Sequence, residues 1–371
     1  MQSGIRIQWI VVSVALFVSI SAGAQQKAAP AQGAPTSAAP SPSQEVNPLP
    51  GPSLPPQFDP KTGQSLYKTV VEDWSSLEIG TSQLHPENPL LGEVDEHETF
   101  TRTLLQLKWR PGDAMDLYVI MPKNVKNPPV VLYLYGFPSD TGRFKDNGWC
   151  ERVTAGGVAA VGMVSALTGH RFHDRPMKEW FVSELQESLG ETVHDVKFIL
   201  DYMASRGDLD MDRVGMFGEG SGGAIAIMAA SVDPRIKALD LLDPWGDWPD
   251  WIAKTYVIDD EQERAQYLKP EFLAKVAPLE PTKWLKTLKT SHVRLQQTMD
   301  DQDSPPEVKA KYKEAAPAQV EVVNFQENTE LFGSESGGKL FDWVKKQVKD
   351  MPAPKTAVAQ DERPGASTTK Q

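Results

Sequence analysis

The apolar and polar residues of this chain fall into blocks that predict a regular succession of strands and helices. Residues 130–135 and 158–164 are short continuous apolar runs, which suit strands covered on both faces. Between residues 182 and 206 apolar side chains recur with helical spacing, and Gly207 follows as a typical helix stop. The pattern therefore predicts strand and helix units that follow one another.

The same alternation continues along the chain. A hairpin is expected at residues 100–109 and 115–121, because Pro111-Gly112-Asp113 between them favours a turn. Alternation of this kind predicts an α/β fold with a mostly parallel sheet, helices on both faces, and a site on the edge where the strands end. Strands are also expected after residue 213 and at 238–242, 293–297 and 320–325, helices at 306–315 and 339–348, and a small Trp-rich helical insertion at 244–290.

The two ends of the chain differ in composition from the rest. Arg6, the apolar run 10–20 and Ala22-Gly23-Ala24 have the layout of a secretory signal peptide, residues 1–24. Residues 25–57, rich in Pro and Ala, and the tail 352–371 cannot bury enough apolar surface to order, so both are expected to be disordered. Residues 58–351 then form one domain of a protein that is periplasmic or secreted.

Charge and cysteine content narrow the set of partners. The net charge of −12 disfavours nucleic acid and, once the signal peptide is cleaved, an anionic membrane surface. Cys150 is the only cysteine, so the chain has no internal disulfide, and a small buried side chain is expected there. No cofactor is predicted. The pair His170 and His173 lacks a third ligand at a diagnostic spacing, so no metal is predicted either.

The segment 213–230 carries the most specific signal. It combines a buried strand, a glycine-packed bend and a helix of small residues, which is the layout of a nucleophile elbow. Such an elbow normally follows the pattern Gly-x-Ser-x-Gly, because the strained turn needs neighbours without side chains. With Gly218 and Gly222 as the two outer glycines, Gly220 stands where the serine belongs.

Three segments together resemble the α/β-hydrolase superfamily, nearest to its dienelactone-hydrolase and acyl-peptidase-like esterase branch. They are the strand 130–137, the strand 212–218 and the loop 299–306, and the resemblance extends over residues 99–348. It implies an α/β-hydrolase fold and a serine, histidine and aspartate acting together on an acyl carbon.

Carried over residue by residue, the resemblance implies a degenerate triad. Asp301 matches the acid, Gly220 replaces the nucleophile, and Thr329 stands near the position of the base. No histidine follows His292, so a small shift of the alignment cannot restore the base. The first hypothesis is therefore an exported, catalytically impaired hydrolase homologue, a pseudoenzyme that keeps a pocket for an unknown small-molecule ligand.

The alternative hypothesis is an active serine esterase or peptidase-like hydrolase. In this reading Ser221 is the nucleophile, Asp301 or Asp243 is the acid, and His170 or His173 is the base. Glu219 then takes a position that favours glycine, and its charge would oppose a developing oxyanion. The simpler interpretation of Ser221 is a hydroxyl that caps the elbow helix.

A pocket is expected beside the elbow in either case. Backbone N–H groups after Tyr135 and Gly136, at Phe137, and at Ser221 could bind a carbonyl or carboxylate oxygen, since main-chain donors do not depend on side chains. Asp243 and Trp245 begin a run that alternates carboxylates with indoles, which suits sugars, cations or aromatic ligands. The same indoles could instead pack the insertion onto the sheet. An unknown ligand or acyl substrate is the expected partner.

Overall fold

The computed structural model describes residues 72–78, 88–110, 113–137, 141–166, 184–332 and 339–352. All of them belong to one compact unit, Leu54–Gln371. The predicted signal peptide and linker, and nearly all of the predicted tail, lie outside the described residues, as do His170 and His173. No helix among the described residues is long and apolar enough to cross a membrane.

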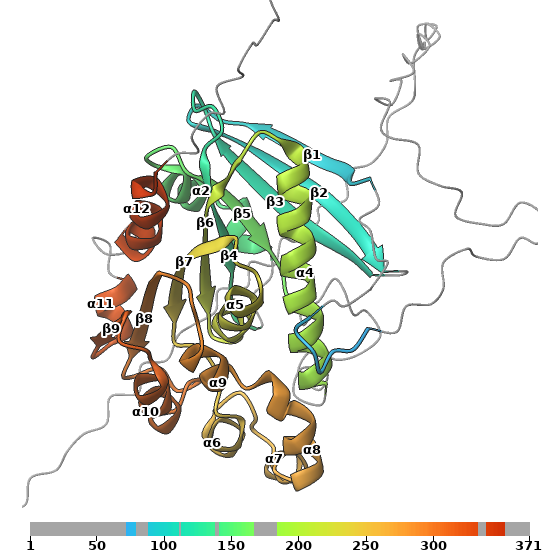
Figure 1. Cartoon of the computed structure of the whole chain (residues 1–371), viewed down its shortest axis with the longest axis vertical. Coiled ribbons are helices and arrows are strands. Elements are labelled where there is room, and N and C mark those ends of the chain that lie inside the picture. The colour runs from blue at the N-terminus through green and yellow to red at the C-terminus, as the bar shows by residue number, and fades with distance from the viewer. Residues whose placement is uncertain are drawn as a thin grey trace, which may run out of the picture. The chain divides into compact units, whose positions relative to one another are not determined.

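The described residues form a nine-stranded sheet in the order β1-β2-β3-β5-β4-β6-β7-β8-β9 (Figure 1). Strands β1, β2 and β3 pair antiparallel, β3 also pairs antiparallel with β5, and all later neighbours are parallel. The predicted mostly parallel sheet is confirmed. The bounds are β1 Leu90–Glu96, β2 Phe100–Arg110, β3 Asp113–Pro122, β4 Pro129–Leu134, β5 Ala159–Met163, β6 Asp210–Glu219, β7 Ile236–Leu242, β8 His292–Thr298 and β9 Val320–Phe325.

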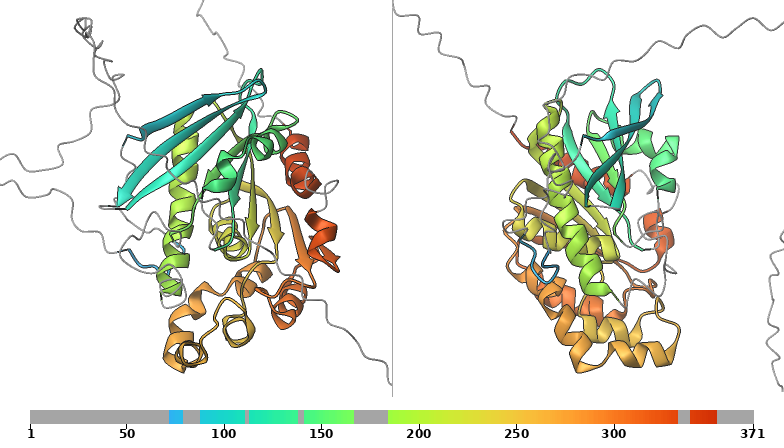
Figure 2. Two further views of the ribbon diagram at one scale, coloured as in Figure 1. Left: turned by 180° about the vertical axis from the view of Figure 1, so that it is seen from behind. Right: turned by 90° about the vertical axis from the view of Figure 1, so that its right-hand side faces the viewer.

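Helices cover both faces of the sheet (Figure 2). On β6, the α-carbon of Gly215 faces Val344 and Val348 of the last helix, whereas Gly218, three residues later, faces the elbow helix. An odd step along a strand reverses the face, so these two helices lie on opposite sides. The elbow helix α5 (Ser221–Val232) shares its side with α4 (Leu185–Arg206), and α12 (Asp342–Asp350) lies opposite.

The other helices are shorter. The last predicted helix starts with a 3-10 turn, η2 Lys339–Phe341, before α12 begins. Cys150 is fully buried, as predicted. The remaining helices are α1 Gly142–Lys145, α2 Asn147–Thr154, α10 Pro306–Ala315 and α11 Asn328–Phe332, and the insertion contains α6 Trp248–Lys254, α7 Glu261–Tyr267, α8 Pro270–Val276, η1 Ala277–Leu279 and α9 Pro281–Lys286.

A buried ionic cluster fastens the segment 72–78 to β2 and α4. Arg110 binds the carboxylates of Glu72 and Asp195, the latter at 2.5 Å. His194 is buried, with its ring nitrogens 3.0 Å from Glu72 and 2.9 Å from the Ser76 carbonyl. Charged groups stay buried only when paired in this way.

The elbow helix approaches the sheet so closely that only glycine fits at its start. A Cβ atom on Gly222 would lie 2.3 Å from the Leu134 carbonyl oxygen, and one on Gly218 would lie 2.5 Å from the Gly222 carbonyl oxygen. Both neighbours are backbone atoms, which cannot move aside as a flexible side chain can. The glycines of the elbow pattern therefore have a packing role that is independent of any chemistry.

We expect Gly222→Ala to lower the free energy of unfolding by at least about 3 kcal/mol, because the added methyl meets backbone in a close-packed core. Gly207→Ala is the matched control. Its φ is +73° and no atom lies within 4 Å of an added Cβ, so only the backbone conformation opposes alanine. We expect that change to cost about 1 kcal/mol. Urea unfolding measures both, and equal losses would contradict the packing argument.

Candidate functional site

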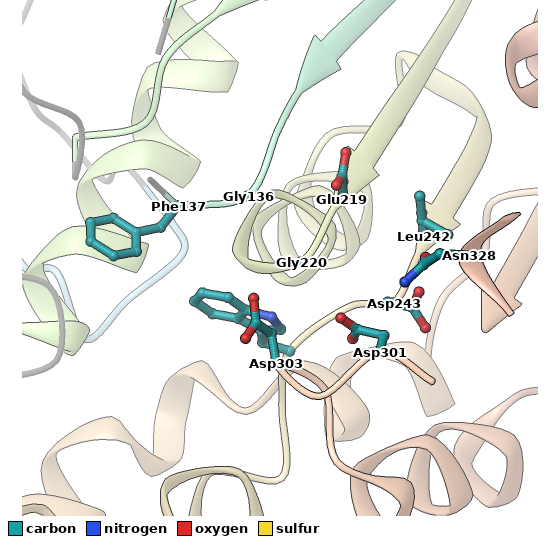
Figure 3. Close-up of a pocket in the computed structure, with 10 residues that line it drawn as sticks. Gly136, Phe137, Glu219, Gly220, Leu242, Asp243, Asp301, Asp303 and Asn328 are labelled. Atoms are coloured by element: carbon teal, nitrogen blue, oxygen red, sulfur yellow. The ribbon is translucent and has the colours of Figure 1, made fainter. Parts of the chain in front are cut away.

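A cavity of about 110 Å³ lies at the carboxyl edge of the parallel strands (Figure 3). Its walls come from the ends of five adjacent strands, β4, β6, β7, β8 and β9. This is the edge on which the sequence predicted a site. The lining residues are Gly136, Phe137, Glu219, Gly220, Leu242, Asp243, Trp245, Asp301, Asp303 and Asn328.

Gly220 forms the turn between β6 and α5. Its backbone has φ +57° and ψ −121°, a conformation that residues with side chains rarely adopt. The turn is fixed by hydrogen bonds, because the Gly220 N–H donates to the Leu242 carbonyl at 2.9 Å and the Gly220 carbonyl accepts from Trp245 N–H at 3.0 Å. A Cβ atom here would lie 3.2 Å from Trp245 Nε1. The strained geometry of an elbow is thus present, but the position has no nucleophile.

Ser221 does not face the cavity. The residue is 0% exposed, and its Oγ accepts a hydrogen bond from the Phe137 N–H at 2.9 Å. The sequence interpretation of Ser221 as a helix cap is wrong, because Gly220 is the N-cap residue and no side chain caps this helix. The expectation that the Phe137 N–H is open to a ligand is also wrong, since the Ser221 hydroxyl already accepts from it.

Asp301 lines the cavity from the loop after β8. Its carboxylate accepts from Ser304 N–H at 2.9 Å, and the buried Lys309 ammonium lies 3.8 Å from it while donating to the Asp301 carbonyl at 2.7 Å. Burial raises the pKa of Asp301, although Lys309 opposes the shift. Asp301 therefore lines the cavity, and its polar contacts come from its own loop and from Lys309.

Asp243 lines the cavity from the end of β7, with a strained backbone at φ +42°. Both carboxylate oxygens bind Thr298 of the neighbouring β8, one through its N–H at 2.9 Å and the other through its hydroxyl. Burial, and next the nearby Asp301 charge, raise the pKa of Asp243 to about 7. Asp243 therefore connects two strand ends through its carboxylate.

Two further carboxylates complete an acidic lining. Glu219 lies with one oxygen 3.6 Å from the Arg143 guanidinium, and burial raises its pKa despite that cation. Burial also raises the pKa of Asp303, a residue that the sequence analysis missed because an exposed acidic turn is common. Tyr135, predicted to line the pocket, does not do so, since its hydroxyl accepts from Trp149 Nε1 at 2.7 Å in the core.

The loop after β9 contributes an amide side chain to the cavity. Asn328, the first residue of α11, lines the cavity, whereas Thr329 is exposed and its hydroxyl donates to Glu327 at 3.1 Å. The Asn328 N–H donates to Asp300 at 2.9 Å, which fixes the start of this helix. Thr329, which the resemblance implied to lie near the base position, does not line the cavity, whereas its neighbour Asn328 does. Among the described residues no histidine lines the cavity.

The indoles of the insertion mostly serve packing. Trp248 and Trp251 are fully buried, and their Nε1 groups donate to the Leu279 and Asp303 carbonyls, both at 2.8 Å. The Trp251 contact fixes the loop that carries Asp303. Trp245 differs, because its ring is buried and also lines the cavity. The packing interpretation of the Trp-rich run is confirmed for Trp248 and Trp251, whereas a ligand-binding role of Trp245 stays a prediction.

The lining has the donors and acceptors for binding a small polar molecule but not for metal chelation. Within the described part of the chain, no three His, Cys, Asp or Glu side chains are placed to hold a metal ion. In Figure 3 Asp301 and Asn328 point into the space beneath Gly220. Four lining carboxylates give the cavity a negative potential, which favours ligands that donate hydrogen bonds over anions.

Comparison with solved structures identifies the fold. The acetyl xylan esterase 1 of Thermoanaerobacterium sp. JW/SL YS485 superposes with a TM-score of 0.58 at 15% identity, over 72% of this chain and 89% of that one. The S-formylglutathione hydrolase of Agrobacterium tumefaciens gives 0.53 at 14% identity, over 70% and 99%. The acylaminoacyl peptidase of Pyrococcus horikoshii gives 0.53 at 15% identity, over 70% and 43%. The chain has the α/β-hydrolase fold.

Sequence similarity agrees and is more local. YtaP of Bacillus subtilis (strain 168), which its name assigns provisionally to the hydrolases, is 29% identical over 163 residues. The match spans 38% of this chain and 52% of YtaP, so the chain spans about half the length of this curated relative. No protein-family model matches the chain. The protein is hydrolase-like in fold and in sequence.

The Asp243 carboxyl predicts how stability depends on pH. Its pKa in the folded state is about 7, against 3.8 for a free side chain. Between pH 3.8 and about 7 the folded protein therefore holds a proton on Asp243 that the unfolded chain has released. Stability therefore decreases as pH rises from about 4 to 7, by about 2–4 kcal/mol from this group. Asp243→Asn should flatten that decrease and be at least as stable as the wild type at pH 7. The free energy of unfolding of both proteins, measured with urea at pH 5 and 7.5, tests this. An equal decrease between the two pH values in the wild type and in Asp243→Asn would contradict it.

Proposed function

We propose that the protein is an exported hydrolase homologue without serine-hydrolase activity, whose cavity binds a small polar ligand. The observation that carries this proposal is Gly220 at the turn where the α/β-hydrolase fold places its nucleophile, in the strained backbone conformation of an elbow. A side chain with a hydroxyl is missing at that turn. Without the nucleophile and base, most of the acceleration available to such a triad is lost.

The second support is the base position. Asn328, whose side-chain amide does not take up a proton near neutral pH, lines the cavity where the resemblance implies a histidine. The acid Asp301 remains, but it now has Lys309 and Ser304 as its polar neighbours. An orienting carboxylate has no catalytic use without an imidazole to orient.

The competing proposal, an active esterase that uses Ser221, is weaker for a physical reason. The Ser221 hydroxyl is buried, lies outside the lining of the cavity, and already accepts the Phe137 N–H. To attack an acyl carbon it would need a rotation into the cavity, the loss of that hydrogen bond, and a base. Glu219 and Asp301 beside the turn would also oppose the negative charge of the intermediate.

Export is proposed from the sequence of the first 24 residues. A periplasmic or secreted location is supported by Arg6, the apolar run 10–20 and Ala22-Gly23-Ala24, which have the layout of a signal peptide. Loss of residues 1–24 from the mature protein, measured by intact mass after expression in a bacterium with a periplasm, tests this location.

We expect no covalent adduct when the purified protein is incubated with a fluorophosphonate probe, because Ser221 is buried and no histidine among the described residues lines the cavity beside it. Intact-mass spectrometry detects the adduct, and peptide mapping locates it. A serine hydrolase labelled in the same tube is the positive control. Stoichiometric labelling at Ser221, abolished by Ser221→Ala, would overturn the proposed function in favour of the active esterase.

Restoring the missing groups should create activity only in combination. We expect Gly220→Ser with Asn328→His to hydrolyse p-nitrophenyl acetate at least about tenfold faster than either single variant, because a serine needs its base. The added Cβ at position 220 meets the Trp245 ring at 3.2 Å, so a modest loss of stability is expected as well. The control is Gly220→Ser with Thr329→His, since Thr329 is exposed and does not line the cavity. Equal rates for the two double variants would contradict the placement of Asn328.

A further inference from the structure

We propose that Ser221 determines which ligands the cavity accepts, because its hydroxyl occupies the Phe137 N–H, one of the backbone donors that an acyl carbonyl oxygen would need. This inference rests on the proposed function and adds a third change to the loss of nucleophile and base. The donor is the Phe137 N–H, a main-chain group just after the end of β4. The inference assigns to Ser221 a positioning role, not a step in catalysis.

The geometry places this donor beside the elbow. Phe137 and the preceding Gly136 both line the cavity, and a Cβ atom on Gly136 would lie 3.0 Å from the Glu219 carbonyl oxygen and 3.4 Å from the Gly220 Cα. The turn at residues 136–137 thus lies directly against the backbone of the elbow. An oxygen bound next to Gly220 would take its hydrogen bond from the Phe137 N–H.

The Ser221 hydroxyl already accepts from that N–H. The nitrogen-to-oxygen distance is 2.9 Å, within the normal range, and Ser221 is 0% exposed, so water does not compete for the contact. One N–H makes one good hydrogen bond, and a ligand oxygen can use it only by displacing the serine hydroxyl. The displaced hydroxyl would then be a buried polar group without its partner, which opposes the exchange.

The rest of the lining does not compensate for this loss. Four of the ten lining residues, namely Glu219, Asp243, Asp301 and Asp303, have carboxyl groups, and above the raised pKa of these groups they are ionised and only accept hydrogen bonds. A ligand whose polar group is a carbonyl or carboxylate oxygen therefore meets mainly acceptors. The cavity selects against acyl ligands and in favour of molecules that donate hydrogen bonds.

Nuclear magnetic resonance of the Phe137 amide, with acetamide as the probe, tests the inference. Acetamide is small and uncharged, and its carbonyl can accept from an open N–H. In Ser221→Ala the amide loses its internal acceptor, so we expect its hydrogen exchange to accelerate at least about tenfold. We also expect acetamide to shift the Phe137 amide resonance in Ser221→Ala and not in the wild type.

Two variants serve as controls. Ser221→Thr keeps the hydroxyl and should restore the slow exchange and the insensitivity to acetamide. Ser231→Ala removes another hydroxyl of α5, one that donates to the Ile227 carbonyl at 2.8 Å, and should leave Phe137 unchanged. If Ser221→Ala does not fold, the titration of the wild-type protein with acetamide still tests the inference. A shift of the wild-type Phe137 amide with acetamide overturns the inference, as does an unchanged amide in a folded Ser221→Ala.

The measurements on the Phe137 amide require no turnover, so their result does not depend on whether the proposed function is correct. Esterase activity of the wild type would refute the proposed loss of serine-hydrolase activity. The Phe137 measurements would still test the role of Ser221. In the Gly220→Ser and Asn328→His background, adding Ser221→Ala should raise kcat about tenfold or more, since it opens an oxyanion donor. A lower or equal kcat in a folded triple variant would also overturn the inference.

Discussion

The close approach of the elbow to the end of β4 is the constraint on which the rest of the site depends. Gly222 lies against the Leu134 carbonyl, and Gly136 lies against the Glu219 carbonyl, so two loops from distant parts of the chain meet without side chains between them. This contact forces the unusual backbone at Gly220 and brings the Phe137 amide next to it. The geometry of an enzyme is thus retained by packing, independently of whether a nucleophile is present.

The charges of the cavity follow from the same arrangement. Parallel strands end at one edge, and here the ends of three of them, β6, β7 and β8, or the loops that follow, carry the four acidic residues of the lining. Burial raises the pKa of each of these carboxyl groups, while Arg143 and Lys309 partly offset the effect for Glu219 and Asp301. A site that stabilises an oxyanion needs the opposite arrangement, with donors and positive charge around the reacting oxygen. The acidic lining therefore supports the proposed absence of serine-hydrolase activity.

Much of the fold could be predicted from the sequence, because buried strands and amphipathic helices leave periodic patterns. Strand β1 could not, since nearly all of its residues are exposed and no apolar face marks it. The site was predictable where it depends on strand ends, as for Gly220, Asp243 and Asp301. The site was not predictable where a contact joins residues that lie far apart in the sequence. The partner of the Ser221 hydroxyl is 84 positions away, and the start of α11 decides that Asn328, not Thr329, lines the cavity.

The measurement that tests the central claim most directly is the pre-steady-state release of p-nitrophenol from p-nitrophenyl acetate by the wild-type protein. Serine hydrolases of this chemistry acylate first, which gives a burst equal to the number of active sites. The account predicts no burst above the buffer rate, because position 220 has no side chain and the Ser221 hydroxyl is buried in another hydrogen bond. A burst of one equivalent that disappears in Ser221→Ala would contradict it.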